Sequence, residues 1–130
     1  MDNLERQPSP EPDPPTILVC DDDPSLRELV RAVLGPRYRF LEASDGKEAL
    51  DAMRELSPDL IVLDVMLPGL SGIDVLEAMR ADDKLSGTPV VVITAWSHAE
   101  VEAWTAGADR FVSKPFDPDE LSGAVEELLA

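Results

Sequence analysis

The sequence predicts a single α/β domain in which a doubly wound sheet of five parallel strands is covered by helices on both faces. Five short apolar runs alternate with amphipathic segments along the chain. The runs are continuously apolar, which is typical of parallel strands buried on both faces. The chain has 130 residues, of which 44% are hydrophobic, so it has room for one such domain with its core and for little else.

The first half of the chain contains three predicted strands and two predicted helices. The strands are expected at residues 16–20, 38–43 and 60–63. Asp23 offers an N-cap and Pro24 a first position for a helix that stops at Gly35. The core-facing side chains of this helix are expected to be Leu26, Leu29, Val30, Val33 and Leu34. A second helix is expected at residues 46–56, with a buried face formed by Ala49, Leu50, Met53 and Leu56.

The second half continues the alternation of strands and helices. Strands are expected at residues 90–93, which are rich in β-branched side chains, and at 110–112. Helices are expected at residues 72–81, 99–106 and 118–129. The inward side chains are expected to be Ile73, Leu76 and Met79 in the first of these helices, and Leu121, Val125 and Leu128 in the last. Consecutive strand–helix units of this kind form right-handed crossovers.

Residues 1–15 differ from the rest of the chain. Five prolines alternate there with acidic and small residues, as in the segment PSPEPDPP at residues 8–15. Such a composition buries too little apolar surface to offset the chain entropy of folding. We therefore expect a disordered, acidic, proline-rich tail at residues 1–15 and a folded domain at residues 16–130.

Charge and cysteine content exclude several classes of protein. The chain carries 27 acidic and 11 basic side chains, a net charge of -16, which argues against direct nucleic-acid binding and against docking on an anionic membrane. The same charge favours the attraction of cations. Cys20 is the one cysteine, so no internal disulfide forms. No apolar run approaches the roughly 20 residues of a membrane span, and no signal peptide is recognised, so a cytoplasmic location is expected.

Polar residues follow four of the predicted strands at their carboxyl ends. Asp21, Asp22 and Asp23 follow the first strand, and Asp64 follows the third. Thr94 follows the fourth strand, and Lys114 follows the fifth after one serine. Ligands of open parallel sheets bind outside the carboxyl ends of the strands. The sequence therefore predicts that acidic groups, a hydroxyl and an ammonium gather at one edge of the sheet.

This set of groups suits phosphoryl transfer. Carboxylates that are brought close together repel one another, and a hard divalent ion such as Mg²⁺ relieves the repulsion. An aspartate oxygen can attack phosphorus and form an aspartyl-phosphate. Lys114 and Thr94 could bind phosphoryl oxygens, one through its charge and the other through its hydroxyl. Positioning and charge stabilisation are most of what this chemistry requires.

Four segments resemble the signatures of the response-regulator receiver domain of two-component signalling. They are ILVCDDD at residues 17–23, DVMLPGLSG at 64–72, VITA at 92–95 and FVSKPF at 111–116. Each is weak alone, but all four in this order and at these spacings are specific. The resemblance runs from about Thr16 to the C-terminus and implies a flavodoxin-like (βα)5 fold.

The resemblance also implies a role for individual residues. Asp64 would be the phosphoacceptor, and Mg²⁺ would be held by the carboxylates of Asp21, Asp22 and Asp64 with the backbone carbonyl of Met66. Thr94 and Lys114 would contact the phosphoryl oxygens as catalytic residues. Thr94 and Phe111 would form the conformational switch, which packing alone would transmit because Phe111 lacks the hydroxyl of a tyrosine. Cys20 and Leu67 depart mildly from the family pattern, away from this chemistry.

The resemblance further implies the partners of the domain. A histidine kinase or a histidine phosphotransfer protein would be the phosphodonor, and a downstream effector protein would read the phosphorylated state. The domain would catalyse only its own phosphorylation and dephosphorylation and would not be an enzyme. A phosphorylation-dependent homodimer is compatible with this interpretation. No effector domain follows the last helix, so we expect output through protein contacts, unless the chain is a piece of a longer protein.

Alternative functions remain open from the sequence. A Mg²⁺-dependent phosphatase of the haloacid-dehalogenase type would need a second acid two residues after Asp64, where Met66 stands. A receiver-like binding module that is never phosphorylated would not need the complete residue set. A flavodoxin-like cofactor site would not tolerate three acids after the first strand. Taken singly, Asp23 is expected to cap a helix, Trp104 to pack, and His98 to lie on the surface.

Overall fold

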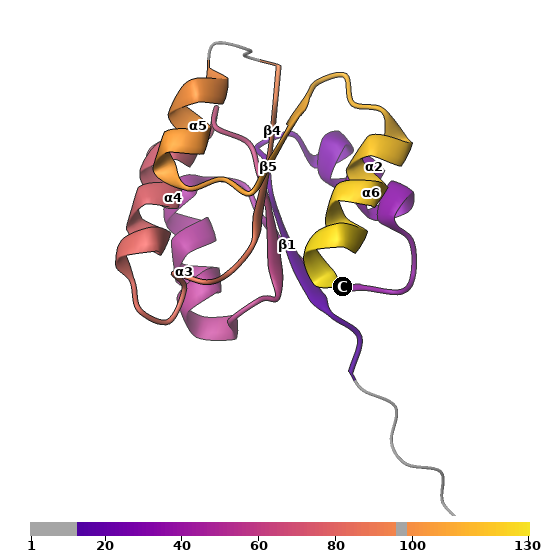
Figure 1. The fold of residues 1–130 in the computed structure, drawn as a ribbon, viewed down its shortest axis with the longest axis horizontal. Helices are drawn as coiled ribbons and strands as arrows, with labels where there is room; N and C mark the ends of the chain where they lie inside the picture. Colours follow the sequence, from indigo (N-terminus) through magenta and orange to yellow (C-terminus); the bar gives the residue numbers. More distant parts are fainter. Residues whose placement is uncertain (1–12, 96–98) are drawn as a thin grey trace, which may run out of the picture.

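The computed structural model describes residues 13–95 and 99–130 of the chain, and the predicted tail at residues 1–15 falls largely outside them. Strands and helices alternate along the chain (Figure 1). The strands are β1 (Thr16–Cys20), β2 (Arg39–Ala43), β3 (Leu60–Leu63), β4 (Val90–Thr94) and β5 (Arg110–Ser113). The helices are α2 (Pro24–Leu34), α3 (Gly46–Leu56), α4 (Gly72–Ala81), α5 (Glu100–Ala106) and α6 (Pro118–Leu129).

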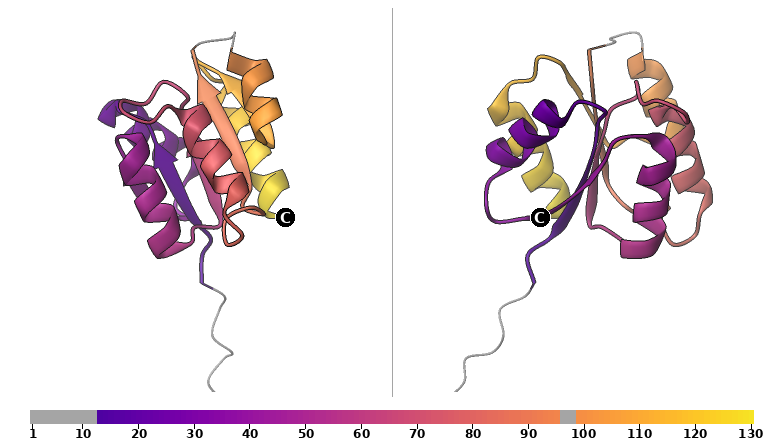
Figure 2. Two further views of the ribbon diagram at one scale, coloured as in Figure 1. Left: turned by 90° about the vertical axis from the view of Figure 1, so that its left-hand side faces the viewer. Right: turned by 180° about the vertical axis from the view of Figure 1, so that it is seen from behind.

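The five strands form one parallel sheet in the order β2-β1-β3-β4-β5. Helices α2 and α6 cover one face of this sheet, and α3, α4 and α5 cover the other (Figure 2). This arrangement confirms the predicted doubly wound, flavodoxin-like α/β fold. The chain leaves β1 toward β2 on one side and returns to β3 on the other. Strands β1 and β3 therefore flank the topological switch point, where open α/β sheets bind their ligands.

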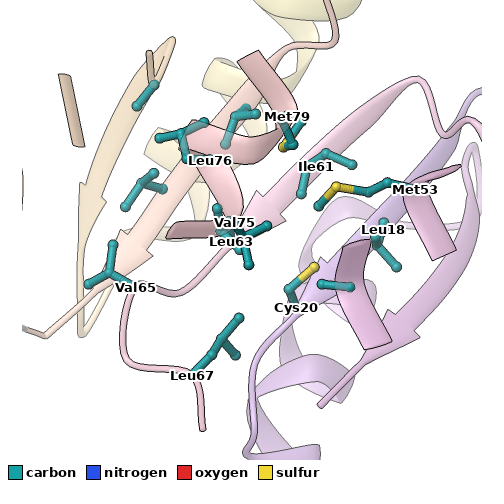
Figure 3. Packing of buried hydrophobic residues seen from close by; sticks show 14 of the residues in the cluster. Leu18, Cys20, Met53, Ile61, Leu63, Val65, Leu67, Val75, Leu76 and Met79 are labelled. Atoms are coloured by element: carbon teal, nitrogen blue, oxygen red, sulfur yellow. The ribbon is translucent and has the colours of Figure 1, made fainter. Parts of the chain in front are cut away.

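Two separate hydrophobic cores hold the layers together. In β1, the side chains of Leu18 and Cys20 point into the core under α3, α4 and α5, which Figure 3 shows from close by. The side chains of Ile17 and Val19 point into the core under α2 and α6. Successive side chains of a strand face opposite sides of a sheet, so a continuously apolar strand supplies both cores at once.

Helix starts agree well with the sequence prediction. Asp23 caps α2 as expected, since its side chain accepts a hydrogen bond from the backbone N–H of Ser25. Asp45, Ser71 and Asp117 cap α3, α4 and α6 in the same way. Helix α5 begins at Glu100, one residue later than predicted, because Ala99 is its N-cap and offers no side-chain hydrogen bond.

Two leucines that were predicted to be buried are exposed. Leu29 is 49% exposed and Leu56 is 55% exposed. Leu29 lies about 100° around α2 from the buried Val30, so it falls outside the stripe that meets the sheet. Leu56 is the last residue of α3, beyond the point where the helix packs on the sheet. Apolar spacing predicted a wider buried face than the helices use.

Gly72 lies against the backbone at the carboxyl end of β3. A β-carbon on this first residue of α4 would overlap the carbonyl oxygen of Asp64 and the α-carbon of Val65. We expect Gly72→Ala to lower the free energy of unfolding by about 2 kcal/mol or more, because the atoms that must move belong to the backbone. Gly123→Ala is the matched control, since Gly123 lies on the exposed side of α6 with nothing within 4 Å of the added carbon, and it should raise stability by about 0.5 kcal/mol. Urea unfolding of both variants would measure this, and equal stabilities would contradict the close approach.

Candidate functional site

The carboxyl end of the sheet brings together residues that are far apart in the sequence. Asp21 follows β1 directly, Asp64 follows β3, Thr94 ends β4, and Lys114 follows β5. Backbone hydrogen bonds extend the ladder past the strands, from the N–H of Asp64 to the carbonyl of Cys20 at 3.0 Å and from the N–H of Lys114 to that of Thr94 at 2.9 Å. The sheet therefore fixes the backbone positions from which these four side chains extend.

Lys114 reaches across the sheet and bridges the two carboxylates. Its Nζ atom lies 2.7 Å from Oδ2 of Asp21 and 2.6 Å from Oδ2 of Asp64. Asp21 is 2% exposed and Asp64 is 4% exposed, so both charges are held away from water. Because one nitrogen contacts both oxygens, the two carboxylates face a common point that a cation occupies.

The other oxygen of each carboxylate is held by the backbone. Oδ1 of Asp21 accepts a hydrogen bond from the N–H of Asp23, and Oδ1 of Asp64 accepts one from the N–H of Met66, each at 2.9 Å. Among the described residues, no buried side-chain oxygen or nitrogen lacks a hydrogen-bond partner. The N–H of Met66 therefore fixes Oδ1 of Asp64, and Oδ2 of the same carboxylate faces Lys114.

A pocket opens beside Asp64. It has a volume of about 400 Å³ and is lined by Asp64, Met66, Thr94, Ala95 and Lys114. Met66 and Ala95 are exposed at its mouth, whereas Asp64 and Thr94 lie buried within it. A small ligand in this pocket meets the buried carboxylate, the threonine and the ammonium together.

Burial shapes the ionisation of the two bridged groups. Burial away from water raises the pKa of Asp21 above its usual range; the hydrogen bonds from Lys114 and Asp23 offset this in part, and the charge of Asp64 adds to it. For Lys114, burial opposes protonation, but the hydrogen bonds and charges of Asp21 and Asp64 outweigh it and raise the pKa. Lys114 is therefore held in its protonated form, whereas the negative charge of buried Asp21 is unfavourable for the folded state.

Asp21→Asn is expected to stabilise the fold near neutral pH. When the pKa of a carboxyl group is raised in the folded state, the protein loses stability as the pH rises from the ordinary pKa of about 3.9 through the higher folded pKa. An asparagine removes this cost and keeps the oxygen that accepts from Asp23. We expect the free energy of unfolding to rise by about 1 kcal/mol near neutral pH, with the gain vanishing below the ordinary pKa.

Urea unfolding near neutral pH and again below the ordinary carboxyl pKa of about 3.9 would measure this effect. Asp22→Asn is the matched control, because Asp22 is the neighbouring aspartate but is exposed, and it should change stability by less than about 0.5 kcal/mol. Equal or lower stability of Asp21→Asn at both pH values would contradict the cost assigned to this charge.

The structure does not bring the remaining predicted site residues, Asp22 and Phe111, into the cluster that Lys114 bridges. Asp22 is exposed, and among residues 13–95 and 99–130 no three His, Cys, Asp or Glu side chains gather into a group that could hold a metal ion. Phe111 is partly buried in β5 and packs against the core of α3, α4 and α5. The structure thus brings together Asp21, Asp64, Thr94 and Lys114 but leaves the carboxylate of Asp22 outside.

The donor set nevertheless fits a hard divalent cation. Two buried carboxylates share a single ammonium, so the cluster keeps one uncompensated negative charge. Its atoms are oxygens, which Mg²⁺ prefers as ligands. Asp22 adds a third carboxylate next in sequence to Asp21, at the solvent-exposed side. The chemistry of these residues suits Mg²⁺.

Sequence reasoning missed Arg27, whose guanidinium touches this site. Its Nη1 atom donates to the backbone carbonyl of Asp21 at 2.6 Å. One signal could have found it, because Arg27 lies close to the start of α2, where the helix dipole disfavours positive charge. A cation at that position suggests a specific acceptor.

Trp104 was predicted to pack and is covered less than that prediction implied. Trp104 is 44% exposed on α5, and its indole nitrogen donates to Oε1 of Glu100 at 3.3 Å. The seven-residue helix α5 turns its small side chain Ala103 toward the core, which leaves Trp104 on the outside. His98, which was predicted to lie on the surface, and Trp96 fall outside the described residues.

The fold and the pocket together define an open parallel α/β domain with a carboxylate–ammonium site at the carboxyl end of its sheet. The model of the response regulator receiver domain family matches residues 17–126. The chain belongs to this family, as the resemblance of its four segments predicted. Receiver domains of response regulators are signalling domains, and the phosphoacceptor role is general for the family.

Individual relatives agree with this assignment. The chain is 48% identical over 116 residues to the DNA-binding response regulator MtrA of Mycolicibacterium smegmatis, covering 87% of this chain and 50% of the relative. It is 42% identical over 121 residues to the probable transcriptional regulatory protein TcrX of Mycobacterium tuberculosis, covering 89% and 50%. A crystal structure of a putative response regulator from Chloroflexus aurantiacus superposes with a TM-score of 0.86 at 33% identity, covering 90% of this chain and 98% of that one.

These relatives correct one prediction about partners. The net charge led us to expect no direct nucleic-acid binding, and this expectation is wrong, because relatives at 47–48% identity are named DNA-binding response regulators. The chain spans about half the length of the curated relatives that it matches. Net charge describes only the surface of these 130 residues and is no guide to the other half of such relatives.

Within the described residues, no helix is long and apolar enough to cross a membrane. The cytoplasmic location stays a prediction.

Proposed function

We propose that this receiver domain, at residues 16–130, accepts a phosphoryl group on Asp64 from a histidine kinase or a histidine phosphotransfer protein and signals through protein contacts. The observation that carries this proposal is the bridge of Lys114 between Asp21 and Asp64 at the wall of the 400 Å³ pocket. A buried carboxylate that is fixed on one oxygen and faces a cation on the other is prepared for a phosphoryl group.

Mg²⁺ is part of the proposal. The residues that would hold it are Asp21, Asp22 and Asp64, with the backbone carbonyl of Met66. When bound, the ion would neutralise negative charge on the phosphoryl oxygens during transfer. Asp22 would have to turn its exposed carboxylate toward Asp21 to take part.

The chain's own residues would carry the transfer. An oxygen of Asp64 attacks the phosphorus of a donor phosphohistidine, so that an O–P bond forms as the N–P bond breaks. The backbone N–H of Met66 holds the other oxygen of Asp64 in place during the attack. The Lys114 ammonium moves from the carboxylate to a phosphoryl oxygen, and its raised pKa keeps it protonated for this role. The domain thereby catalyses only its own modification.

Thr94 and Phe111 would transmit the modified state. The hydroxyl of Thr94, which lines the pocket, would donate to a phosphoryl oxygen. Thr94 pairs with β5 through the backbone, and Phe111 lies in β5 against the core of α3, α4 and α5. A shift of Thr94 toward the phosphate would change the packing of Phe111 and so alter the surface of β5 and its neighbours. A downstream effector would recognise this altered surface.

Acetyl phosphate, a small donor that needs no partner protein, would test the proposal. Intact-mass spectrometry should show one added phosphoryl group per chain in the presence of MgCl₂ and none when the metal is chelated. Labelling that is equal with and without a chelator would contradict the metal's part in the proposal. No labelling under either condition would contradict the phosphoacceptor function itself.

A further inference from the structure

Arg27 connects the acidic site to the edge strand β2. Its Nη1 atom donates to the backbone carbonyl of Asp21 at 2.6 Å, and its Nε atom donates to Oε1 of Glu42 at 2.8 Å. The Arg27 side chain is 16% exposed, so it is largely fixed by these contacts. One guanidinium therefore ties the β1–α2 connection to Glu42 on the neighbouring strand.

The Asp21 carbonyl belongs to the peptide group that links Asp21 to Asp22. The preceding peptide group, between Cys20 and Asp21, is held as well, because the N–H of Asp21 donates to the carbonyl of Ala43 at 3.1 Å. With the carbonyl held by Arg27, the direction in which the chain enters Asp22 is set as well. Asp22 is exposed, so its backbone governs where its carboxylate can reach.

We propose that Arg27 is a positioning residue for the divalent cation site, which it serves by orienting the Asp21–Asp22 peptide. This inference rests on the proposed function, because it concerns the residues that would hold Mg²⁺. Arg27 does not itself touch the metal. It acts through the backbone, as the outer partners of metal ligands commonly do.

Charge and geometry predict opposite effects of removing Arg27. A guanidinium beside a cation site repels the cation, so an effect through charge would make Mg²⁺ bind more tightly once Arg27 is lost. A loosened Asp21–Asp22 peptide would make Mg²⁺ bind more weakly. Glu42 offsets part of the Arg27 charge, whereas the bond from Arg27 to the Asp21 carbonyl is direct, so we expect the geometric effect to dominate.

Arg31 provides a matched control one helical turn away. Its Nη1 atom lies 3.2 Å from Oε2 of the same Glu42, and no contact joins it to Asp21 in the part of the chain that the structure describes. Arg31→Gln removes the same charge and a bond to the same glutamate as Arg27→Gln does. The two variants differ in the bond to the Asp21 carbonyl.

The test is a titration of the isotope-labelled protein with MgCl₂, followed through the amide chemical shifts of residues 21–23 and 64–66. We expect Arg27→Gln to bind Mg²⁺ roughly tenfold more weakly than the natural sequence, and Arg31→Gln to stay within about twofold. Arg27→Lys restores the charge without the two-armed geometry, so it should remain weak. Urea unfolding of the same samples establishes that each variant is folded during the titration.

Each other outcome overturns the inference in a distinct way. Unchanged or tighter binding by Arg27→Gln would show that the peptide does not depend on Arg27. Equal weakening in Arg27→Gln and Arg31→Gln would assign the effect to the contact with Glu42 that both arginines share. Full recovery in Arg27→Lys would show that the two-armed contact of the guanidinium is not needed. If the natural sequence shows no Mg²⁺ binding, the proposed function itself fails, and the role of Arg27 falls with it.

Discussion

Asp64→Asn is expected to abolish the labelling of this domain by acetyl phosphate. The amide keeps the size and one oxygen of the carboxylate but is not a nucleophile, so no acyl phosphate can form. Asp64 sits 4% exposed at the wall of the pocket with one oxygen fixed by the N–H of Met66, so no neighbouring carboxylate can take its place without rebuilding the loop. Intact-mass spectrometry after incubation with donor and MgCl₂ measures the result.

The control for this substitution is Asp51→Asn. Asp51 is an exposed aspartate on α3 that pairs with Lys47 across one helical turn and does not line the pocket beside Asp64. Its loss should leave labelling unchanged. Labelling of Asp64→Asn at the level of the natural sequence would remove Asp64 from the chemistry, whereas loss of labelling in both variants would indicate a general effect of the change in charge.

Lys114→Met is expected to destabilise the domain by about 3 kcal/mol in the absence of divalent cations. Removal of the ammonium leaves the buried carboxylates of Asp21 and Asp64 facing each other without a counter-charge, which is the costly way to break a buried pair. Added MgCl₂ should return much of this stability, so the metal-induced increase should be larger in Lys114→Met than in the natural sequence. Urea unfolding with and without MgCl₂ measures both quantities.

Lys47→Met is the control that separates the effect of burial on stability from the effect of an ion pair alone. Lys47 lies 2.8 Å from Asp51, much the same distance as in the Lys114 bridge, but its side chain is 82% exposed. Its loss should leave the free energy of unfolding almost unchanged, because water and salt screen an exposed ion pair. The natural sequence should also lose the Lys114 contribution as pH rises above about 10.4 and through the raised folded pKa. Equal stability of Lys114→Met and the natural sequence near neutral pH would contradict the bridge.

The convergence of Asp21, Asp64 and Lys114 could be predicted because it follows from a single rule. Parallel strands end at the same edge of the sheet, so residues placed just after β1, β3 and β5 must approach one another. The continuous apolar runs that indicated those strands also reported burial on both faces, which the two cores confirm. The order of strands then brought Asp21 and Asp64 to adjacent positions, within reach of one long lysine side chain.

The features that sequence did not predict depend on contacts between elements. Arg27 contributes through the Asp21 carbonyl and Glu42, and nothing in the spacing of α2 and β2 shows that these meet. Arg80 lies in the last turn of α4 like an ordinary basic residue, yet its guanidinium donates to the carbonyls of Gly107 and Thr88 and to the carboxylate of Asp109. Leu29 and Leu56 fit the helical spacing but lie outside the contact with the sheet. Each depends on a tertiary distance that a one-dimensional pattern does not contain.

The central claim is that the oxygen facing Lys114 and the pocket belongs to the residue that takes the phosphoryl group. Borohydride reduction converts an aspartyl-phosphate into homoserine, which peptide mass spectrometry locates by residue. After labelling with acetyl phosphate and MgCl₂, we expect homoserine at position 64 and unmodified aspartate at positions 21 and 22. Homoserine at either of those two positions, with aspartate retained at position 64, would contradict the account.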